Sequence, residues 1–201
     1  KLAFRECTVT GVVDDLSEAF PGTSSGTEWR GITDRVMGGM SNGLLRRELD
    51  LKGRPANVLV GHVSLKNNGG FLQMVTDLPL DASNPSVDAS KYDGIEFDVL
   101  YRQVENKNDD NTKGEDASSA KDESMGTFNM HVRTPGTFQQ ASYRHTFCIE
   151  KEDTWETFRV PFSSFEAYGG GSEMPEKLDP SELRRIGLVG IGREMDIFLA
   201  M

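Results

Sequence analysis

The sequence predicts an all-β fold of the sandwich or jelly-roll kind. Long stretches with an apolar residue every three to four positions, which are typical of amphipathic helices, are hard to find. Many short segments instead alternate apolar and polar residues, as strands with one buried face do, and turn residues separate them. Roughly eight to ten such strands joined by long surface loops are typical of two packed antiparallel sheets.

The expected strands follow one another from residue 58 to the C-terminus. Residues 58–65 (VLVGHVSL) and 71–78 (FLQMVTDL) flank the turn signal NNGG, so these two segments are expected to pair as a hairpin. The other expected strands lie at 94–101, 127–134, 142–150, 155–162, 184–192 and 195–201.

Two places favour a short helix. The stretch from Asp14 to Phe20 has room for one or two turns. Asp179 and Pro180 form a helix start, because Asp accepts backbone N–H groups at the N-cap and Pro suits the first helical position. A few short helices on an otherwise all-β chain agree with the fold class.

Residues 103–125 differ in kind from the rest of the chain. They are polar and acidic, with too few apolar side chains to offset the entropy lost on ordering. We therefore expect a flexible acidic insertion in a loop between two strands. The whole chain, 1–201, is expected to form a single domain whose core spans about 29–201.

The charge of the chain excludes several classes of protein. Thirty-two acidic residues against twenty-two basic ones give a net charge of −10, whereas nucleic-acid binding needs clustered Lys and Arg. No apolar run approaches the roughly 18 residues that cross a bilayer. The first residues carry no leader pattern, so we expect any targeting presequence to lie outside this sequence.

No catalytic, cofactor or metal-binding template fits the sequence. The stretch VMGGMSNG lacks the Lys-Ser/Thr ending of a phosphate-binding loop, and GLVGIG is followed by Met195 where a dinucleotide-binding loop needs a small residue. His62, His131 and His145 stand in no metal-ligand spacing. We therefore predict a protein that is not an enzyme and carries no cofactor or metal.

Two cysteines, Cys7 and Cys148, stand far apart and form no CxxC pattern. Two readings stay open. Both residues are buried free thiols, or they form a single disulfide if the first strand lies beside a late one.

The stretch DRVMGGMSNG, residues 34–43, is expected to form a tight corner. In a turn, Asp34 accepts backbone N–H groups, and Arg35 offers a two-pronged hydrogen-bond donor to a carboxylate or to carbonyl groups. Gly38 and Gly39 permit positive φ angles or close backbone approach.

Met37 and Met40 are expected to pack as soft apolar fillers beneath this corner. The corner is either purely structural or also a surface that touches a partner or ligand. In the second case the contact residues are Asp34, Arg35, Met37, Gly38, Gly39 and Ser41.

A second polar group is expected where the strands of HVRT and SYRHTF pair. If they are neighbours, Arg133 with Thr134 and Tyr143 with Arg144 converge near one end of the sandwich. This group is either a cross-strand polar contact of modest energy or a second partner or ligand pocket.

Several blocks together resemble one family. These are W-x4-DRVMGGMSNG, G-x-VSLKNNGGF, YDGIEFDV, W-x-TFRVPFSSFE and IGLVGIG followed by FLAM, in this order from about Trp29 onward. Together with RT…SYRHTF, which stands between YDGIEFDV and W-x-TFRVPFSSFE, they resemble the NADH:ubiquinone oxidoreductase complex I intermediate-associated protein 30 family. The resemblance implies a galactose-binding-like jelly roll without catalytic residues or cofactor. Mitochondrial members act as assembly factors for respiratory complex I, and related domains in plastids and cyanobacteria are linked to biogenesis of the photosynthetic apparatus.

The resemblance implies a non-enzymatic protein-binding module in assembly, or a peripheral subunit, of a large organellar membrane complex. That complex is respiratory complex I or a photosynthetic complex such as a photosystem. The location is the mitochondrial matrix, or the plastid stroma or thylakoid surface. The acidic 103–125 segment would suit docking on a basic surface. The alternative, from fold analogy alone, is a carbohydrate-binding jelly roll.

Overall fold

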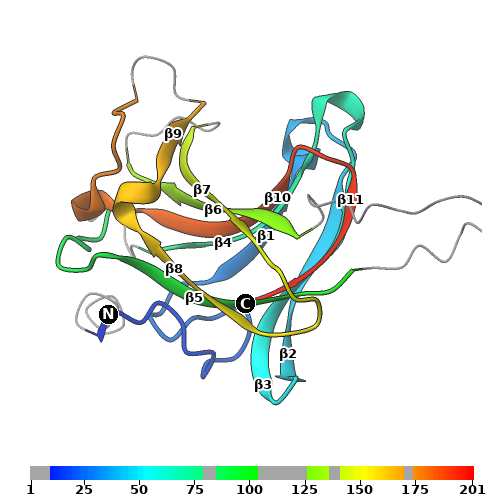
Figure 1. The fold of residues 1–201 in the computed structure, drawn as a ribbon, viewed down its shortest axis with the longest axis horizontal. Coiled ribbons are helices and arrows are strands. Elements are labelled where there is room, and N and C mark those ends of the chain that lie inside the picture. Colours follow the sequence, from blue (N-terminus) through cyan, green and yellow to red (C-terminus); the bar gives the residue numbers. More distant parts are fainter. Residues whose placement is uncertain (1–9, 79–84, 104–125, 136–140, 170–173) are drawn as a thin grey trace, which may run out of the picture.

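The computed structural model describes residues 10–78, 85–103, 126–135, 141–169 and 174–201. Its strands form two antiparallel sheets that pack face to face (Figure 1). The short helical elements that lie wholly within these residues are 3₁₀ turns, namely η1 (Asp34–Met37), η2 (Lys66–Asn68), η3 (Phe162–Ser164) and η5 (Pro180–Glu182). No helix in this part of the chain combines the length and apolar character needed to cross a membrane.

The two sheets contain all eleven strands that the described residues form. The six-stranded sheet has the order β1 (Trp29–Thr33), β4 (Phe71–Asp77), β10 (Arg185–Ile191), β6 (Thr127–Arg133), β7 (Ser142–Cys148), β9 (Glu166–Tyr168). The five-stranded sheet has the order β2 (Asn42–Leu51), β3 (Arg54–Val63), β11 (Met195–Ala200), β5 (Gly94–Tyr101), β8 (Glu156–Pro161). The all-β prediction is confirmed.

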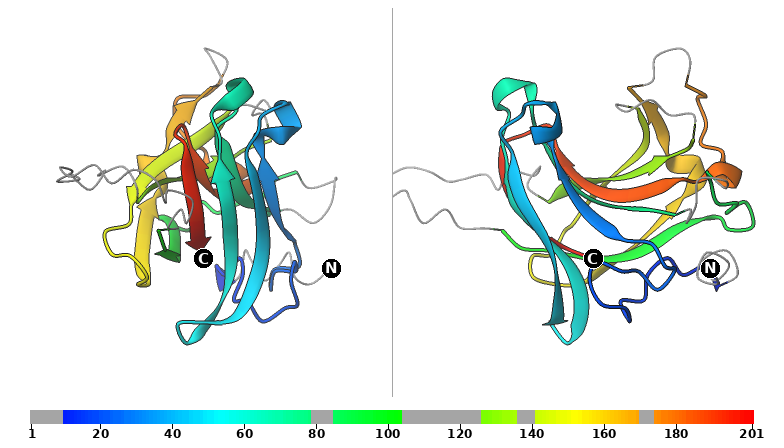
Figure 2. Two further views of the ribbon diagram at one scale, coloured as in Figure 1. Left: turned by 90° about the vertical axis from the view of Figure 1, so that its right-hand side faces the viewer. Right: turned by 180° about the vertical axis from the view of Figure 1, so that it is seen from behind.

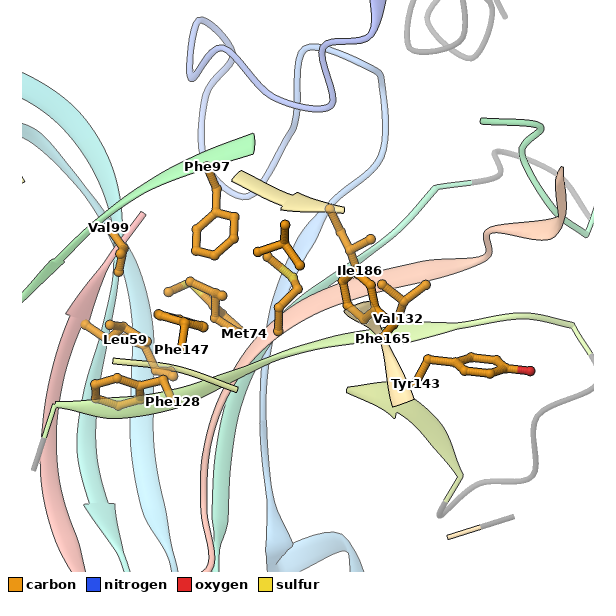
Figure 3. Close-up of a cluster of buried hydrophobic side chains, with 14 of the residues drawn as sticks. Leu59, Met74, Phe97, Val99, Phe128, Val132, Tyr143, Phe147, Phe165 and Ile186 are labelled. Carbon is orange, nitrogen blue, oxygen red and sulfur yellow. The ribbon is translucent and has the colours of Figure 1, made fainter. Parts of the chain in front are cut away.

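The core lies between the sheets and follows the alternation in the sequence. Every second residue of a strand faces it, as in β6, where Phe128, Met130 and Val132 are buried. Figure 3 shows part of this cluster, with side chains from both sheets. The Phe147 ring lies 4.8 Å from that of Phe158 and 5.3 Å from that of Phe97, measured between centroids. Such aromatic pairs each add about 0.5–1.5 kcal/mol beyond area burial.

The predicted hairpin of 58–65 with 71–78 is wrong, although both segments are strands. β3 pairs with β2 and β11, whereas β4 pairs with β1 and β10 in the other sheet. The NNGG segment is a crossover between sheets. The true hairpin joins β2 to β3 through Lys52 and Gly53, whose φ angles of 55° and 85° suit a type I′ turn.

The predicted helix from Asp14 to Phe20 is also wrong. The Asp14 and Asp15 carboxylates accept the N–H groups of Leu16 and Ser17, at 2.9 and 3.0 Å. Leu16 has a φ of 64°. These local hydrogen bonds compete with a helix and hold an irregular segment instead.

The helix start at Asp179 is confirmed but extends for a single 3₁₀ turn. The Asp179 carboxylate accepts the N–H of Ser181 at 2.9 Å, and Pro180 begins the turn. The acidic segment 103–125 falls outside the described residues except for Gln103, and so does Cys7. Cys148 is an exposed free thiol, so the reading of two buried thiols is wrong for this residue.

The six-stranded sheet is strongly curved. Figure 2 shows β10 and β6 arching so that the sheet face turned away from the core is concave. The turns η1 and η2 rise at one end of this face, and β9 rises at the other (Figures 1 and 2). The two sequence-predicted polar groups therefore lie toward opposite ends of the same sheet.

Candidate functional site: the Asp34 corner and the concave face

The Asp34 carboxylate is the centre of the corner that residues 34–43 form. Asp34 is fully buried. Its Oδ1 accepts the Ser41 N–H at 2.9 Å, and its Oδ2 accepts the Ser41 hydroxyl and the Gly70 N–H, both at 2.5 Å. Oδ2 also lies 3.4 Å from the N–H of Phe71. One side chain thus joins η1 and the start of β2 to the crossover that leads into β4.

These hydrogen bonds keep the Asp34 carboxyl ionised. Burial alone would raise its pKa, but the donors from Ser41, Gly70 and Phe71 outweigh burial and hold the pKa below the ordinary value. Asp34 therefore carries a fixed buried charge at neutral pH. The prediction that it accepts backbone N–H groups in a turn is confirmed.

The glycines around Asp34 are required by its carboxylate. A Cβ atom on Gly39 would lie 2.3 Å from Asp34 side-chain atoms, and one on Gly69 would lie 2.4 Å from Oδ2. Gly38 ends η1 with a φ of 87°, in the left-handed region that favours glycine. The DRVMGG and NNGG stretches, far apart in sequence, are therefore two halves of one structural unit.

The apolar side chains of the corner face solvent. Val36, Met37 and Met40 are 73%, 54% and 51% exposed, and Leu65 at the start of η2 is 46% exposed. The prediction that the two methionines fill space beneath the corner is wrong, because the Asp34 network occupies that space. We call Val36, Met37, Met40 and Leu65 the apolar corner patch.

The Arg35 side chain does not hold the corner. It is exposed, and its guanidinium makes no hydrogen bond or ion pair with any described residue. The backbone N–H of Arg35 donates to the Thr33 hydroxyl at 3.2 Å, which caps η1. The predicted role of Arg35 as a fork within the corner is therefore wrong.

The second predicted group is divided between two faces of the six-stranded sheet. β6 and β7 pair as expected, with Val132 opposite Tyr143. Tyr143 points into the core, where it is 1% exposed and donates its hydroxyl to the Pro175 carbonyl at 3.0 Å (Figure 3). Arg133 and Arg144 lie on the opposite, concave face, because neighbouring strand residues alternate. Tyr143 and the arginines therefore do not converge, and Thr134 directly follows β6.

Polar and charged side chains line the concave face in cross-strand rows. In one row, Asp77, Arg185 and Arg133 are register partners across β4, β10 and β6, and Ser142 and Tyr168 are partners across β7 and β9. The adjoining row contains Arg30, Val75, Gly187, His131, Arg144 and Glu166.

Two arginine contacts organise this face. The Asp77 carboxylate binds Arg185 through hydrogen bonds of 2.6 and 3.2 Å and also pairs with Arg30. Burial tends to raise the Asp77 pKa, but Arg185 and Arg30 lower it below the ordinary value. Arg144 stacks 3.3 Å from the centroid of the Tyr168 ring and donates to the Ser142 hydroxyl at 3.2 Å.

His131 is the functional candidate that sequence reasoning missed. It lies on the concave face, in the same row as Arg144, but is only 8% exposed, and its Nε2 has no hydrogen-bond partner among the described residues. Burial, and then the charges of Arg144 and Arg133, lower its pKa to about 3. The alternation in HVRT and SYRHTF could have indicated this, since it places His131, Arg133 and Arg144 on one face of the two paired strands.

The His131→Phe variant is expected to lose acid sensitivity. The folded-state pKa of His131 lies below its unfolded value of about 6.5, so the unfolded chain binds the proton first and stability falls as pH drops below about 6.5. Burial and the charges of Arg144 and Arg133 oppose that proton. Between pH 7 and pH 5 this residue should remove about 2 kcal/mol of unfolding free energy. Urea denaturation of the wild type and of His131→Phe at pH 7 and pH 5 measures this loss. An equal loss of unfolding free energy in both proteins would contradict the prediction.

A cavity of about 610 Å³ lies between the N-terminal segment and β5. Three of the carboxylates that line it are ion-paired, and Asp88 accepts the N–H of Ser90. Asp14 binds Arg47 and Trp29, Asp98 binds Arg54, and Glu96 binds Arg159. This pairing marks them as structural. No group of three or more His, Cys, Asp or Glu residues in the described part of the chain is placed to hold a metal ion.

Comparison with family models decides the family. The model for complex I intermediate-associated protein 30 (CIA30) matches residues 19–100 and 123–199. The chain belongs to the CIA30 family. The matched region includes both halves of the Asp34 corner, the strands of the concave sheet, and all but the last residues of β5 and β11 in the other sheet. No curated protein sequence matches the chain significantly.

Solved structures place this CIA30 chain among galactose-binding-like jelly rolls. A family 11 carbohydrate-binding module from Clostridium thermocellum, in complex with a β-1,3-1,4-mixed-linked tetrasaccharide, has a TM-score of 0.62 at 15% identity. The alignment covers 94% of this chain and 89% of that one. The family 11 module of the Clostridium thermocellum cellulase Lic26A-Cel5E gives 0.61 at 15% identity, over 93% and 88% of the two chains. At this identity the likeness shows the fold alone.

Proposed function

We propose that this CIA30 chain is a non-enzymatic protein-binding module in the assembly of a large organellar electron-transport complex. Membership of a family named for complex I intermediates supports assembly of respiratory complex I. We propose further that the chain acts either as an assembly factor or as a peripheral subunit. The complex is respiratory complex I or a photosynthetic complex in plastids. The observation that carries it is the apolar corner patch on a rigid support.

The corner has the properties of a protein-contact surface. Val36, Met37 and Met40 expose apolar surface that would gain free energy on burial. Methionine side chains adapt to the shape of a partner. The Asp34 network fixes the backbone beneath them, so binding would order little of the chain. The alternative that the corner is only structural does not account for the solvent-facing residues.

The Met37→Asp variant is expected to weaken partner binding at least about tenfold, which corresponds to about 1.4 kcal/mol. A charge at the centre of an apolar contact must be desolvated without a partner. Because Met37 is exposed, the fold should be unchanged. The measurement is affinity capture of organellar membrane-complex subunits by the purified chain, quantified by mass spectrometry.

Leu49→Asp is the matched control, because Leu49 is 83% exposed on β2 and belongs to no part of the corner. It should capture partners as the wild type does. Equal capture by both variants, or no respiratory or photosynthetic subunit captured by the wild type, would refute the proposal.

A carbohydrate-binding module is the second candidate. The likeness in fold to family 11 carbohydrate-binding modules favours it, as does Tyr168, which is 55% exposed on the concave face. Its ring is already stacked on Arg144, however, and sugar-binding faces need free aromatic surface. A glycan array tests this candidate, and binding that Tyr168→Ala abolishes would favour it over the assembly role.

A further inference from the structure

The concave face concentrates positive charge on an acidic protein. In its two central rows, four arginines, Arg30, Arg133, Arg144 and Arg185, face the carboxylates of Asp77 and Glu166. Among the described residues of these two rows, arginines outnumber carboxylates by two, while the whole chain has a net charge of −10. Such an inversion of charge favours an anionic ligand.

The arginines repel one another at close range. Burial, followed by the charges of Arg185, Arg144 and Arg184, lowers the pKa of the Arg133 guanidinium below its ordinary value. The charge of Asp77 offsets this only in part. An anion between Arg133 and Arg144 would relieve the repulsion and gain charge-assisted hydrogen bonds from both.

His131 supplies an independent observation at the same place. It is more than nine-tenths buried, and its Nε2 is unpaired among the residues that the structure describes. Its register partners are Gly187 on β10 and Arg144 on β7, so it lies on the floor of the charged area. An unpaired buried ring nitrogen lowers stability unless a ligand hydrogen-bonds to it.

We propose that the concave face binds a phosphate group through the guanidinium groups of Arg133, Arg144 and Arg185, with His131 Nε2 beneath them. A phosphate group carries up to two negative charges at neutral pH, which matches the excess of two arginines. Planar guanidinium groups bind phosphate oxygens in a bidentate manner. A neutral imidazole donates one N–H and adds no further positive charge.

Arg144 is the register partner of His131 on β7. Its guanidinium stacks on the Tyr168 ring and donates to the Ser142 hydroxyl, so a phosphate oxygen would compete there with neutral groups and not with a carboxylate. Asp77, by contrast, fixes Arg185 through two hydrogen bonds.

The probe for this site is inorganic phosphate, titrated by calorimetry against chloride at the same ionic strength. Wild type should bind phosphate, and Arg144→Gln should weaken binding about tenfold or more. His131→Phe should also weaken it while leaving the protein folded. Arg46→Gln is the matched control, since Arg46 is an exposed arginine of β2 paired with Glu48, and it should bind as wild type does.

Vesicles of phosphatidylcholine with and without phosphatidic acid distinguish a lipid headgroup from a free phosphorylated molecule. Binding to phosphatidic acid vesicles that Arg144→Gln abolishes would assign the group to a lipid. Binding of free phosphate alone would assign it to a soluble ligand. Absence of phosphate binding, or equal binding by Arg144→Gln and Arg46→Gln, would overturn the proposal. Met37→Asp should leave phosphate binding unchanged. The phosphate site and the partner-binding role of the apolar corner patch are therefore tested independently.

Discussion

Replacing Asp34 with alanine is expected to lower the free energy of unfolding by about 3–5 kcal/mol. The change removes the acceptor for the Ser41 and Gly70 N–H groups and for the Ser41 hydroxyl, all within a site that excludes water. Buried donors left unpaired cost far more than the hydrogen bonds themselves contribute. Urea denaturation of the purified variant measures the loss, and near-ultraviolet circular dichroism reports whether the corner stays ordered.

Two further variants sharpen this experiment. Asp34→Asn keeps the shape but turns an amide NH₂ toward N–H donors, so it should also be strongly destabilising. Asp88→Ala is the control, because Asp88 caps the N–H of Ser90 on the exposed surface and should change stability little. If Asp34→Ala lost no more than Asp88→Ala, the carboxylate would not be the centre of the corner.

The acid limb of the stability curve gives an independent check on Asp34. Because its folded-state pKa is lowered, its contribution is present above the unfolded value of about 3.9 and is lost as pH falls through the folded value. Asp34→Asn should therefore flatten the curve below about pH 4. His131→Phe flattens it between about pH 6.5 and 3, and the two windows distinguish the residues.

Strand positions followed from the sequence because alternation is a local property. Phe128, Met130 and Val132 face the core where their spacing placed them. The sheet to which each strand belongs is not local. NNGG suits a hairpin and a crossover equally. The Asp34 carboxylate, 36 residues upstream, accepts the Gly70 N–H and so favours the crossover.

The candidate site was predicted only in part, because local features of the sequence do not show which distant residues meet. The glycines and Asp34 were expected to form a corner, and they do. Met37 and Met40 were expected beneath it, but composition alone does not reveal that a carboxylate network already fills that space. Tyr143 and Arg144 were grouped with Arg133 because their strands were expected to pair. The strands do pair, but alternation places Tyr143 on the core face and Arg144 on the face of His131.

Replacing Arg47 with alanine is expected to detach residues 10–28 from the sandwich, at a cost of about 3–5 kcal/mol. The Arg47 side chain is 4% exposed and donates to the Asp14 carboxylate at 3.2 Å and to Asn57 Oδ1 at 3.1 Å. It also donates to the backbone carbonyls of Leu16, Glu18 and Gly22. One guanidinium thus holds most of an irregular segment that has no sheet ladder of its own.

Hydrogen–deuterium exchange separates this effect from global unfolding. In Arg47→Ala, amides within 10–28 should exchange faster, while those of β10 and β6 keep their protection. The Asp14 carboxylate loses its ion pair with Arg47 and keeps the N–H groups of Leu16, Ser24 and the Trp29 indole. Arg46→Ala is the control, since the guanidinium of Arg46 is 48% exposed and its ion pair is the surface contact with Glu48. Unchanged protection across 10–28 in Arg47→Ala would mean that packing around Trp29, and not the buried ion pair, holds the segment in place.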